Sequence, residues 1–421
     1  MPKVLFDISR IFIRGARFSP TGIDRVVVAY ARWLLSRNDI ELQPVLTFGG
    51  SLFGVSRHML ARTIQRNAAF SRQRNSADDI SPAWVALQRA LGSGADPVQP
   101  LRARPVTGQL PHRAKWYLGI VGRALVYLQP FRAAPGDVYI NVSHTGLDQP
   151  GVLGRLAARG VAPVVMVHDL IPINFPEYCA PAAEGRHRRR AAEIIRHARL
   201  VITNSSTTAD ELVCYAKAVG GTAPPTQVAP LGVEGDFLTA PQAMASARPY
   251  FVSVGTIEAR KNGAFLLAIW RELAERMGAD APRLVLVGRR GWENEAVIDH
   301  LQRSKAVIRL VHEVSDLSDR ELARLVGGAA ALLAPSFAEG FDLPVAEALA
   351  LRTPVIASDI PVHRELAGDA ATLIGPLDGP AWLSAIRAAA TARPPAPAYA
   401  APTWPAHFDL LERVLRPLIA A

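Results

Sequence analysis

The stretch that decides the fold is YFVSVGTIEARKNGAFLLAIWRELAERMG, residues 250–278. It begins with an apolar run typical of a buried β-strand and continues, past a glycine turn, into apolar positions at helical spacing. The same alternation of strand, loop and helix continues through the strand-like runs RLVLVGRRG, VIRLVHEV, AALLAPS and PVIAS. This rhythm predicts an α/β, doubly wound parallel sheet with helices on both faces.

The first half of the chain shows the same rhythm. Strand-like runs occur in KVLFDIS, IELQPVLTF, DVYINVS, APVVMVHD and LVITNS, and helical spacing follows the first and the last of them. Because 421 residues suit two domains, we predict Rossmann-like domains at 1–240 and 241–421, with a hinge near 237–247. Two such domains would face a cleft, and ligands of open parallel sheets sit beyond the carboxyl ends of the strands.

Composition narrows the class of protein. Hydrophobic residues make up 49% of the chain and aromatic residues 7%, which is typical of a globular α/β protein. Two cysteines, Cys179 and Cys214, are too few for a disulfide framework. The opening MPKVLFDISRIF reads as a strand rather than a signal peptide, and no apolar run reaches 18 residues. We therefore expect a cytoplasmic protein.

The net charge of +10 is concentrated in one region. Residues 51–135 hold 12 Lys and Arg against 3 Asp, while the rest of the chain is almost balanced. This distribution argues against a nucleic-acid-binding protein and fits either a solvated insertion or a local anionic partner such as a membrane surface. Within this region, RAKWYLGIVGRALVYLQPFR (113–132) mixes aromatic and basic residues. It could dock on the inner face of the cytoplasmic membrane or cover the domain core.

Two glutamates stand in SFAEGFDLPVAEALA, residues 336–350. Pro344 suits the first turn of a helix, which places Glu339 in the preceding loop and Glu347 about one turn into the helix. Backbone N–H groups near Gly340 would face the same space, and a carboxylate can bind a vicinal diol. The pattern therefore predicts a site for sugar hydroxyls, although a solvated loop acid and a capping acid are the ordinary alternative.

Three further motifs carry candidate binding residues. In VSVGTIEARKNG, Gly255 ends a strand, and Arg260 and Lys261 precede a helix, which favours binding of a diphosphate. In VVMVHDLIP, His168 ends a buried strand, where it could contact a substrate or be a satisfied structural residue. In SPTGIDR, Gly22 would bring backbone N–H groups toward a phosphate.

In chain order, VHDLIP, VITNSS, PLGV, SVGTIEARKN and FAEGFDLPVAEALA resemble the family 4 retaining glycosyltransferases of the GT-B fold. The resemblance covers most of the chain and is weakest over 51–135. It implies two Rossmann-like domains facing a cleft, with a C-terminal helix that packs back toward the N-terminal domain. All the motifs together, in this order, are more specific than the paired glutamates alone.

The resemblance also implies residue roles. Glu347 resembles the glutamate that holds the ribose of a nucleotide sugar, and Glu339 resembles the group that holds the donor sugar. Arg260 and Lys261 resemble a diphosphate clamp, and His168 the histidine beside the transferred sugar; these two cations, Glu339 and His168 are the implied catalytic residues. The implied donor site consists of Gly22, Gly255, Thr256, Arg260, Lys261, Glu339, Gly340, Phe341, Asp342, Leu343 and Glu347.

One departure concerns Thr256, which stands where many members of the family carry an arginine. The resemblance implies a metal-independent, same-face reaction without a cofactor, in which the leaving phosphate takes the acceptor proton. We favour GDP-mannose as donor and a saccharide or lipid-linked saccharide of bacterial polysaccharide assembly as acceptor. Alternatives are a sugar-nucleotide epimerase or hydrolase on the same fold, or a non-catalytic sugar-nucleotide-binding protein.

Overall fold

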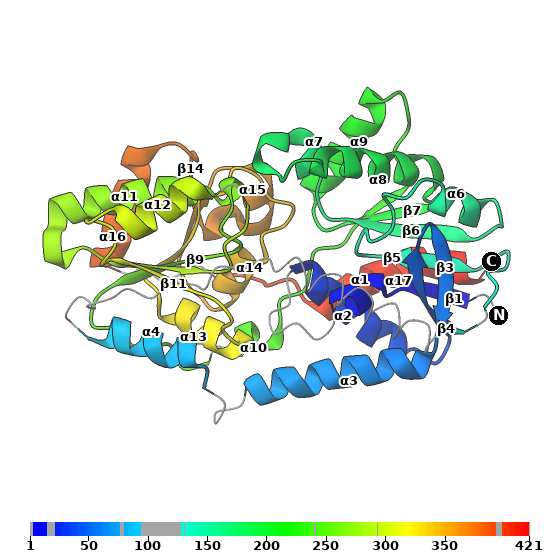
Figure 1. Ribbon diagram of the computed structural model, residues 1–421, viewed down its shortest axis with the longest axis horizontal. Coiled ribbons are helices and arrows are strands. Elements are labelled where there is room, and N and C mark those ends of the chain that lie inside the picture. The colour runs from blue at the N-terminus through cyan, green and yellow to red at the C-terminus, as the bar shows by residue number, and fades with distance from the viewer. Residues whose placement is uncertain are drawn as a thin grey trace.

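The protein has two α/β halves that lie side by side (Figure 1). The computed structural model describes residues 3–14, 22–75, 80–93, 128–129, 131–239, 241–292, 294–392 and 398–420. The segment 113–132, for which we predicted membrane docking, therefore lies almost entirely outside the described residues. Within the described residues, no helix is both long and apolar enough to cross a membrane.

The first half contains an eight-stranded sheet in the order β4-β3-β2-β1-β5-β6-β7-β8. The six strands β2, β1, β5, β6, β7 and β8, which are adjacent in this order, pair in parallel, as the alternation of strands and helices predicts. The strands are β1 (Lys3–Asp7), β2 (Glu41–Phe48), β3 (Ser51–Val55), β4 (Leu128–Gln129), β5 (Val138–Asn141), β6 (Ala162–Val167), β7 (Leu200–Thr203) and β8 (Thr226–Val228).

One edge of this sheet reverses direction. β3 pairs with β2 in antiparallel fashion, and β4 pairs with β3 in the same way. The turn between β2 and β3 contains Gly49 and Gly50, whose φ angles are 56° and 76°. Positive φ at both central residues is the requirement of a type I′ hairpin, which glycine meets without steric cost.

Helices flank the first sheet on both sides (Figure 1). Two helices, α3 and α4, lie in the basic region 51–135. The helices of the first half are α1 (Ser9–Arg14), α2 (Gly22–Ser36), α3 (Arg57–Arg74), α4 (Pro82–Gly92), α6 (Val152–Ala157), α7 (Ile171–Asn174), α8 (Ala183–His197), α9 (Ser206–Ala218) and α10 (Gly235–Leu238).

The second half contains a six-stranded, wholly parallel sheet in the order β11-β10-β9-β12-β13-β14. Its strands are β9 (Tyr250–Val254), β10 (Arg283–Val287), β11 (Val311–Val314), β12 (Ala331–Ala334), β13 (Val355–Ser358) and β14 (Thr372–Ile374). Its helices are α11 (Gly263–Met277), α12 (Glu295–Arg303), α13 (Asp319–Gly328), α14 (Leu343–Ala350), α15 (Pro361–Ala367) and α16 (Gly379–Thr391).

One helix of the first half, α4, packs on the second half, so the chain passes between the halves at more than one point. α4 belongs to the first half by sequence but packs on the second: Trp84 is 1% exposed and lies under the guanidinium of Arg324. The carbonyl of Leu91 accepts hydrogen bonds from the N–H of Ala247 and the hydroxyl of Ser246, both at 3.0 Å. The division near residue 240 thus stays a prediction, and α4 is a segment of the first range built into the second half.

The last helix, α17 (Trp404–Ala420), returns to the first half, where Figure 1 shows it beside α1 and α2. His407 Nε2 lies 2.8 Å from the hydroxyl of Tyr30, and the rings of Trp33 and Phe408 stack at 4.7 Å. These contacts confirm the expected return of the C-terminal helix to the N-terminal domain.

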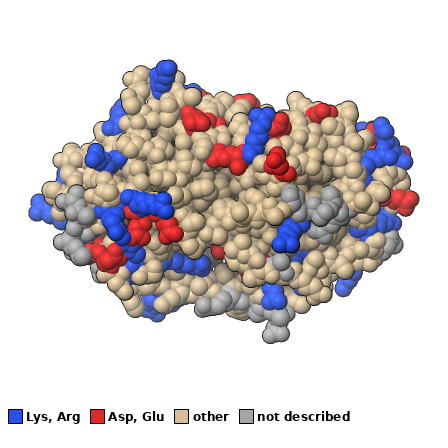
Figure 2. Space-filling model, turned by 180° about the vertical axis from the view of Figure 1, so that it is seen from behind, with Lys and Arg blue, Asp and Glu red and all other residues tan. Residues whose placement is uncertain are grey.

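A single buried cluster links the two halves. It includes Phe6 and Val27 of the first half together with Val252 and Val345 of the second. The halves are therefore packed against each other through apolar side chains. Charged side chains lie on the surface instead, and Figure 2 shows small blue and red groups interspersed over the face of the molecule seen from behind.

Candidate functional site

The predicted motif residues come together at the carboxyl ends of β9 and β12. These strands are neighbours that pair in parallel, so their following loops leave the sheet at the same edge. The first loop forms a 3-10 turn at Ala259–Lys261, and the second carries Glu339. A hydrogen bond from Phe337 N to Arg260 O, at 3.0 Å, fastens the loops together.

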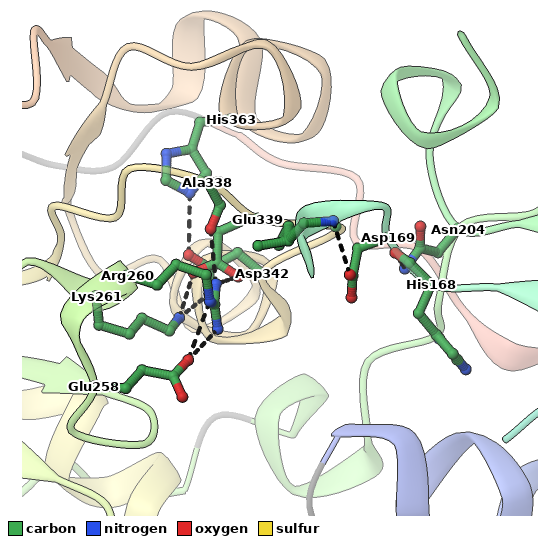
Figure 3. Close-up of polar contacts among 12 residues, drawn as sticks. His168, Asp169, Asn204, Glu258, Arg260, Lys261, Ala338, Glu339, Asp342 and His363 are labelled. Carbon is green, nitrogen blue, oxygen red and sulfur yellow. Dashed lines mark hydrogen bonds and ion pairs between the residues drawn. The ribbon is translucent and has the colours of Figure 1, made fainter. Parts of the chain in front are cut away.

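Glu339 is held by both predicted cations (Figure 3). Its Oε2 lies 2.5 Å from Arg260 Nη1, and its Oε1 lies 2.7 Å from Lys261 Nζ. The side chain of Glu339 is 7% exposed, and those of the two cations are below one-fifth. Arg260 also pairs with Glu258 at 2.8 Å and donates to the carbonyl of Ala338 at 2.7 Å. The cluster is thus a compact, nearly water-free set of charges.

The charges of this cluster sustain one another. Burial alone would raise the pKa of Glu339, but Arg260 and Lys261 lower it below its ordinary value. Burial would likewise lower the pKa of Arg260, and the carboxylates of Glu339 and Glu258 raise it instead. The cations and Glu339 are therefore ionised near neutral pH, which a diphosphate clamp requires.

Asp342 has a side-chain role that the sequence did not indicate. It precedes α14 with φ of 65°, in the left-handed region, and its Oδ1 lies 3.3 Å from Lys261 Nζ. Its Oδ2 lies 3.0 Å from His363 Nε2, while His363 Nδ1 lies 2.8 Å from Ser358 O. Burial opposes the charge of both groups, but Lys261 lowers the pKa of Asp342, and Asp342 raises that of His363.

Glu347 lies one turn into α14, as predicted, and is 3% exposed. Its cationic partner comes from the first half of the chain: Arg25 Nη1 of α2 lies 2.5 Å from Glu347 Oε1. Arg25 Nη2 also pairs with Asp319, at the start of α13. Burial raises the pKa of Glu347 to about 7, because the opposing effect of Arg25 is partly offset by Asp319.

Gly340 marks the closest approach of the two halves. A Cβ atom there would lie 2.1 Å from the carbonyl oxygen of His168, so only glycine fits. Ser205 Oγ donates to Gly340 O at 2.9 Å, and Asn204 Nδ2 donates to His168 O at 3.0 Å. The neighbour in the Cβ direction of Gly340 is the VHDLIP strand end, and the place of this glycine in the donor site stays a prediction.

The ring of His168 points away from the Arg260 cluster (Figure 3). His168 Nε2 lies 2.8 Å from Val142 O, and burial lowers the pKa of the imidazole. Because a carbonyl only accepts, Nε2 carries the hydrogen and Nδ1 bears the lone pair of a neutral ring. The neighbouring Asp169 caps the following turn, since its Oδ1 accepts a hydrogen bond from Ile171 N at 3.1 Å.

The remaining predicted residues surround the same region. Gly22 is the first residue of α2, and a Cβ there would lie 3.8 Å from Leu343 Cδ1. Gly255 has φ of 147°, and a Cβ there would lie 2.9 Å from Lys261 Cε. Phe341 and Leu343 bury their side chains in the core cluster. A small pocket of about 30 Å³ is lined by Ser253, Val254, Gly255, Thr256, Ile257, Glu258, Lys261, Gly263, Leu266, Leu286 and Val287.

Comparison with known proteins agrees with this arrangement. Residues 248–391 match the family described as glycosyl transferases group 1, and this range holds the Arg260 cluster, Glu347 and His363. This part of the chain, residues 248–391, belongs to the group 1 glycosyltransferases. The resemblance noted from the motifs is thereby confirmed, and the transferase domain coincides with the second sheet.

The curated relatives of this glycosyltransferase include O-antigen enzymes. The serotype-specific mannosyltransferase WbdA of Escherichia coli is 31% identical over 230 residues, which is 51% of this chain and 28% of that protein. O-antigen chain mannosyltransferase B of Escherichia coli is 29% identical over 229 residues, 51% of this chain and 58% of that protein. The chain spans less than a third of WbdA and under two thirds of the second relative.

Solved structures confirm the GT-B fold of this glycosyltransferase. Sucrose-phosphate synthase from Thermosynechococcus elongatus aligns over 100% of this chain and 97% of its own, with a TM-score of 0.58 and 16% identity. The Anabaena protein HepE, solved in complex with UDP, aligns over 100% of both chains with a TM-score of 0.56 and 16% identity. At these identities the likeness concerns the fold alone.

Proposed function

We propose that this glycosyltransferase moves a hexose, with mannose favoured, from a nucleotide diphosphate sugar to a hydroxyl of a saccharide or lipid-linked saccharide, with retention at the anomeric carbon. The observation that carries the proposal is the buried cluster of Arg260, Lys261 and Glu339 at the strand ends. The mannosyltransferase names of the relatives support the sugar, and the complex of HepE with UDP supports a nucleotide donor.

Donor binding requires an exchange of partners in this cluster. Arg260 and Lys261 are occupied by carboxylates, so a diphosphate that binds them must displace Glu339 from at least one ion pair. The displaced carboxylate is an acceptor-only group that can take hydrogen bonds from sugar hydroxyls. Glu339 would thus leave the cations and meet the donor sugar in one movement, which couples recognition of the two parts of the substrate.

The chemistry then needs stabilisation of the leaving group above all. As the bond between the anomeric carbon and the phosphate oxygen breaks, negative charge grows on the diphosphate, and Arg260 and Lys261 stabilise it in a site with little water. The acceptor hydroxyl attacks from the same face, and its proton passes to the departing phosphate oxygen. One C–O bond forms as another breaks, so the reaction balances without a protein base.

His168 would act as a polar contact for the transferred sugar rather than as a cation. Its ring is neutral and already donates through Nε2 to Val142, so Nδ1 is the nitrogen left to accept a hydrogen bond. In the structure the ring points away from Glu339, and contact with a sugar would need either a rotation of the side chain or a substrate that reaches beyond Glu339 (Figure 3).

The assignment to polysaccharide assembly at the inner face of the cytoplasmic membrane belongs to the same proposal. It is supported by the O-antigen relatives and by the basic composition of 51–135. The aromatic and basic segment 113–132 supplies the test. Replacement of Arg113, Lys115 and Arg123 by glutamate should abolish co-sedimentation with anionic vesicles, because each lost cation removes about 1 kcal/mol of surface attraction.

Calorimetric titration with GDP, UDP, ADP and dTDP, followed by their sugar conjugates, tests the donor. We expect GDP and GDP-mannose to bind most tightly, and transfer to a mannoside acceptor to give an α-linked product visible by NMR. Release of free mannose or of an altered sugar nucleotide without any acceptor would identify a hydrolase or an epimerase instead. Tight donor binding without turnover under any acceptor would identify a binding protein.

A further inference from the structure

Arg25 links the first half of the chain to the donor half. It lies in the first turn of α2, within the TGIDR motif, and its guanidinium contacts two helices of the second half. Nη1 lies 2.5 Å from Glu347 Oε1 on α14, and Nη2 pairs with Asp319 on α13. The side chains of Arg25 and Glu347 are 14% and 4% exposed, so this ion pair is shielded from water.

The guanidinium is fixed on several sides. Besides its two carboxylate partners, it lies over the ring of Phe237, with Cζ 6.0 Å from the ring centroid. Phe237 is fully buried and belongs to α10, which packs against both α13 and α14. An arginine held by an aromatic ring and two carboxylates presents its fork in one orientation, and thus fixes the carboxylate that it contacts.

A buried ion pair of this kind is weak support for stability, since desolvation of both charges offsets most of their attraction. A packed apolar pair would hold α2 and α14 together at least as well. The arrangement makes sense if Glu347 must stay ionised and oriented for a ligand. In that case the guanidinium holds one carboxylate oxygen and leaves the other to accept hydrogen bonds.

We propose that Arg25 is a positioning residue for the nucleotide: by holding Oε1 of Glu347 it directs the carboxylate toward the ribose hydroxyls of the donor. The proposal rests on the proposed function, in which Glu347 holds that ribose. It adds that the first half of the chain, through the TGIDR motif, sets how strongly the second half recognises the nucleotide.

The charged groups around Glu347 give the proposal a pH signature. Arg25 on α2 favours its ionised form, whereas burial, Asp319 on α13 and Glu234 ahead of α10 disfavour it. These effects leave its pKa at about 7 with Arg25 in place. Without Arg25 the pKa of Glu347 would rise further, so ribose recognition would be lost at a higher pH than in the unmodified protein.

The opposite reading is that Arg25 competes with the ribose for Glu347. Both interpretations concern the same ion pair, but they predict opposite changes in nucleotide affinity when that pair is broken. If Arg25 positions Glu347, removal of the guanidinium weakens binding of a nucleotide that has ribose hydroxyls. If Arg25 competes with them, removal strengthens it. A binding measurement therefore separates the two.

The test compares Arg25→Gln and Arg25→Lys with Arg32→Gln, which removes an exposed arginine from the same helix. The probes are GDP and 2′,3′-dideoxy-GDP, or the corresponding pair for whichever nucleoside diphosphate binds most tightly in the panel above. Unmodified protein should prefer the ribose form by about tenfold or more, the scale for hydrogen bonds to a charged group. The Arg32→Gln protein should keep this ratio.

In Arg25→Gln the ratio should fall below about threefold, and Arg25→Lys should recover part of it. The affinity for the dideoxy form should stay nearly constant, which also reports that the diphosphate site is folded. In unmodified protein the ratio should decline as the pH falls through about 7, and any preference that survives in Arg25→Gln should decline at a higher pH.

Two outcomes overturn the inference. An unchanged ratio in Arg25→Gln would show that Glu347 needs no help from α2, and tighter binding of the ribose form would show that Arg25 competes with the ligand. Failure of the unmodified protein to bind any nucleoside diphosphate would instead overturn the proposed function. The two failures are thus separated by the first titration.

Discussion

Glu339 and Glu347 lie eight residues apart in one stretch of sequence, yet their pKa values shift in opposite directions. Glu339 has a lowered pKa and Glu347 a pKa raised to about 7. Both are buried, so burial cannot explain the difference. Glu339 meets two cations, Arg260 and Lys261, whereas Glu347 meets the single cation Arg25 and must share it with Asp319.

The difference also separates what each half of the molecule contributes. The partners of Glu339 come from the loop after β9, within the same sheet, so the second half builds this charge cluster from its own residues. The partner of Glu347 lies 322 residues earlier in the chain. The proposed cation cluster around Glu339 is therefore built within the second half alone, whereas the ion pair of Glu347 depends on the packing of the two halves.

The largest expected effect comes from the Glu339 side of this comparison. Lys261→Ala removes a cation that contacts both Glu339 and Asp342, and it should lower kcat by about 10²–10³, the scale for losing one preorganised charge stabiliser. Initial-rate kinetics with the sugar-nucleotide donor measure it. Lys305→Ala, which removes an exposed lysine of the same half, is the matched control. Rates within threefold of the unmodified protein would exclude this role for Lys261.

The second prediction concerns the loop that joins the two glutamates. In Gly340→Ala the new methyl would lie 2.1 Å from the carbonyl oxygen of His168, and it would force the halves apart by a shift of ångström size. A misplacement of about 1 Å costs transfer roughly 10²-fold. Binding of free nucleoside diphosphate should weaken as well, because the Arg25–Glu347 ion pair spans the same contact between the halves. In Gly235→Ala, where the added Cβ meets nothing within 4 Å, kcat/KM should be unchanged.

Sequence patterns predicted the parts of the molecule that depend on local order. The strand–helix alternation indicated both sheets, and the motifs VGTIEARKN and FAEGF placed Arg260, Lys261 and Glu339 in loops that follow strands, which the structure shows to be neighbours. Parallel sheets bring such loops together by geometry alone, which is why this cluster was foreseeable.

Other parts depend on how distant segments pack, which no local pattern encodes. α4 is an ordinary amphipathic helix in sequence, and its place on the second half follows from the buried contacts of Trp84. The role of Asp342 depends on a left-handed backbone that turns its carboxylate toward Lys261 and His363. Arg25 lies in the TGIDR motif, which the sequence singled out because of Gly22. The motif could therefore have drawn attention to Arg25, but nothing in the sequence indicated that its partner is Glu347 on α14.

The third prediction separates the two glutamates directly. Glu347→Gln should weaken the affinity for free nucleoside diphosphate by roughly 1–3 kcal/mol, the cost of losing charged hydrogen bonds. Glu339→Gln should leave that affinity unchanged or higher, because Arg260 and Lys261 lose a competing carboxylate, while use of the sugar nucleotide declines. Calorimetry and steady-state kinetics on both variants measure the split. Identical patterns for the two would show that the glutamates do not divide the donor between them.

The smallest expected effect is a pH dependence that should belong to Glu347 alone. Its pKa is raised to about 7, so the carboxylate is ionised above this pH and protonated below it. Ribose binding needs the ionised form, so affinity for nucleoside diphosphate should be full near pH 8 and fall as the pH drops through 7, by at most about tenfold per unit for one proton. Glu339 has a lowered pKa and adds no titration in this window.

The effect of phosphate ionisation in the ligand is removed by comparing each affinity with that of the 2′,3′-dideoxy form. In Glu347→Gln the ribose-dependent part of the profile should be flat from pH 6 to 8. A slope that survives this substitution would assign the titration to another group and remove the contrast between the two glutamates.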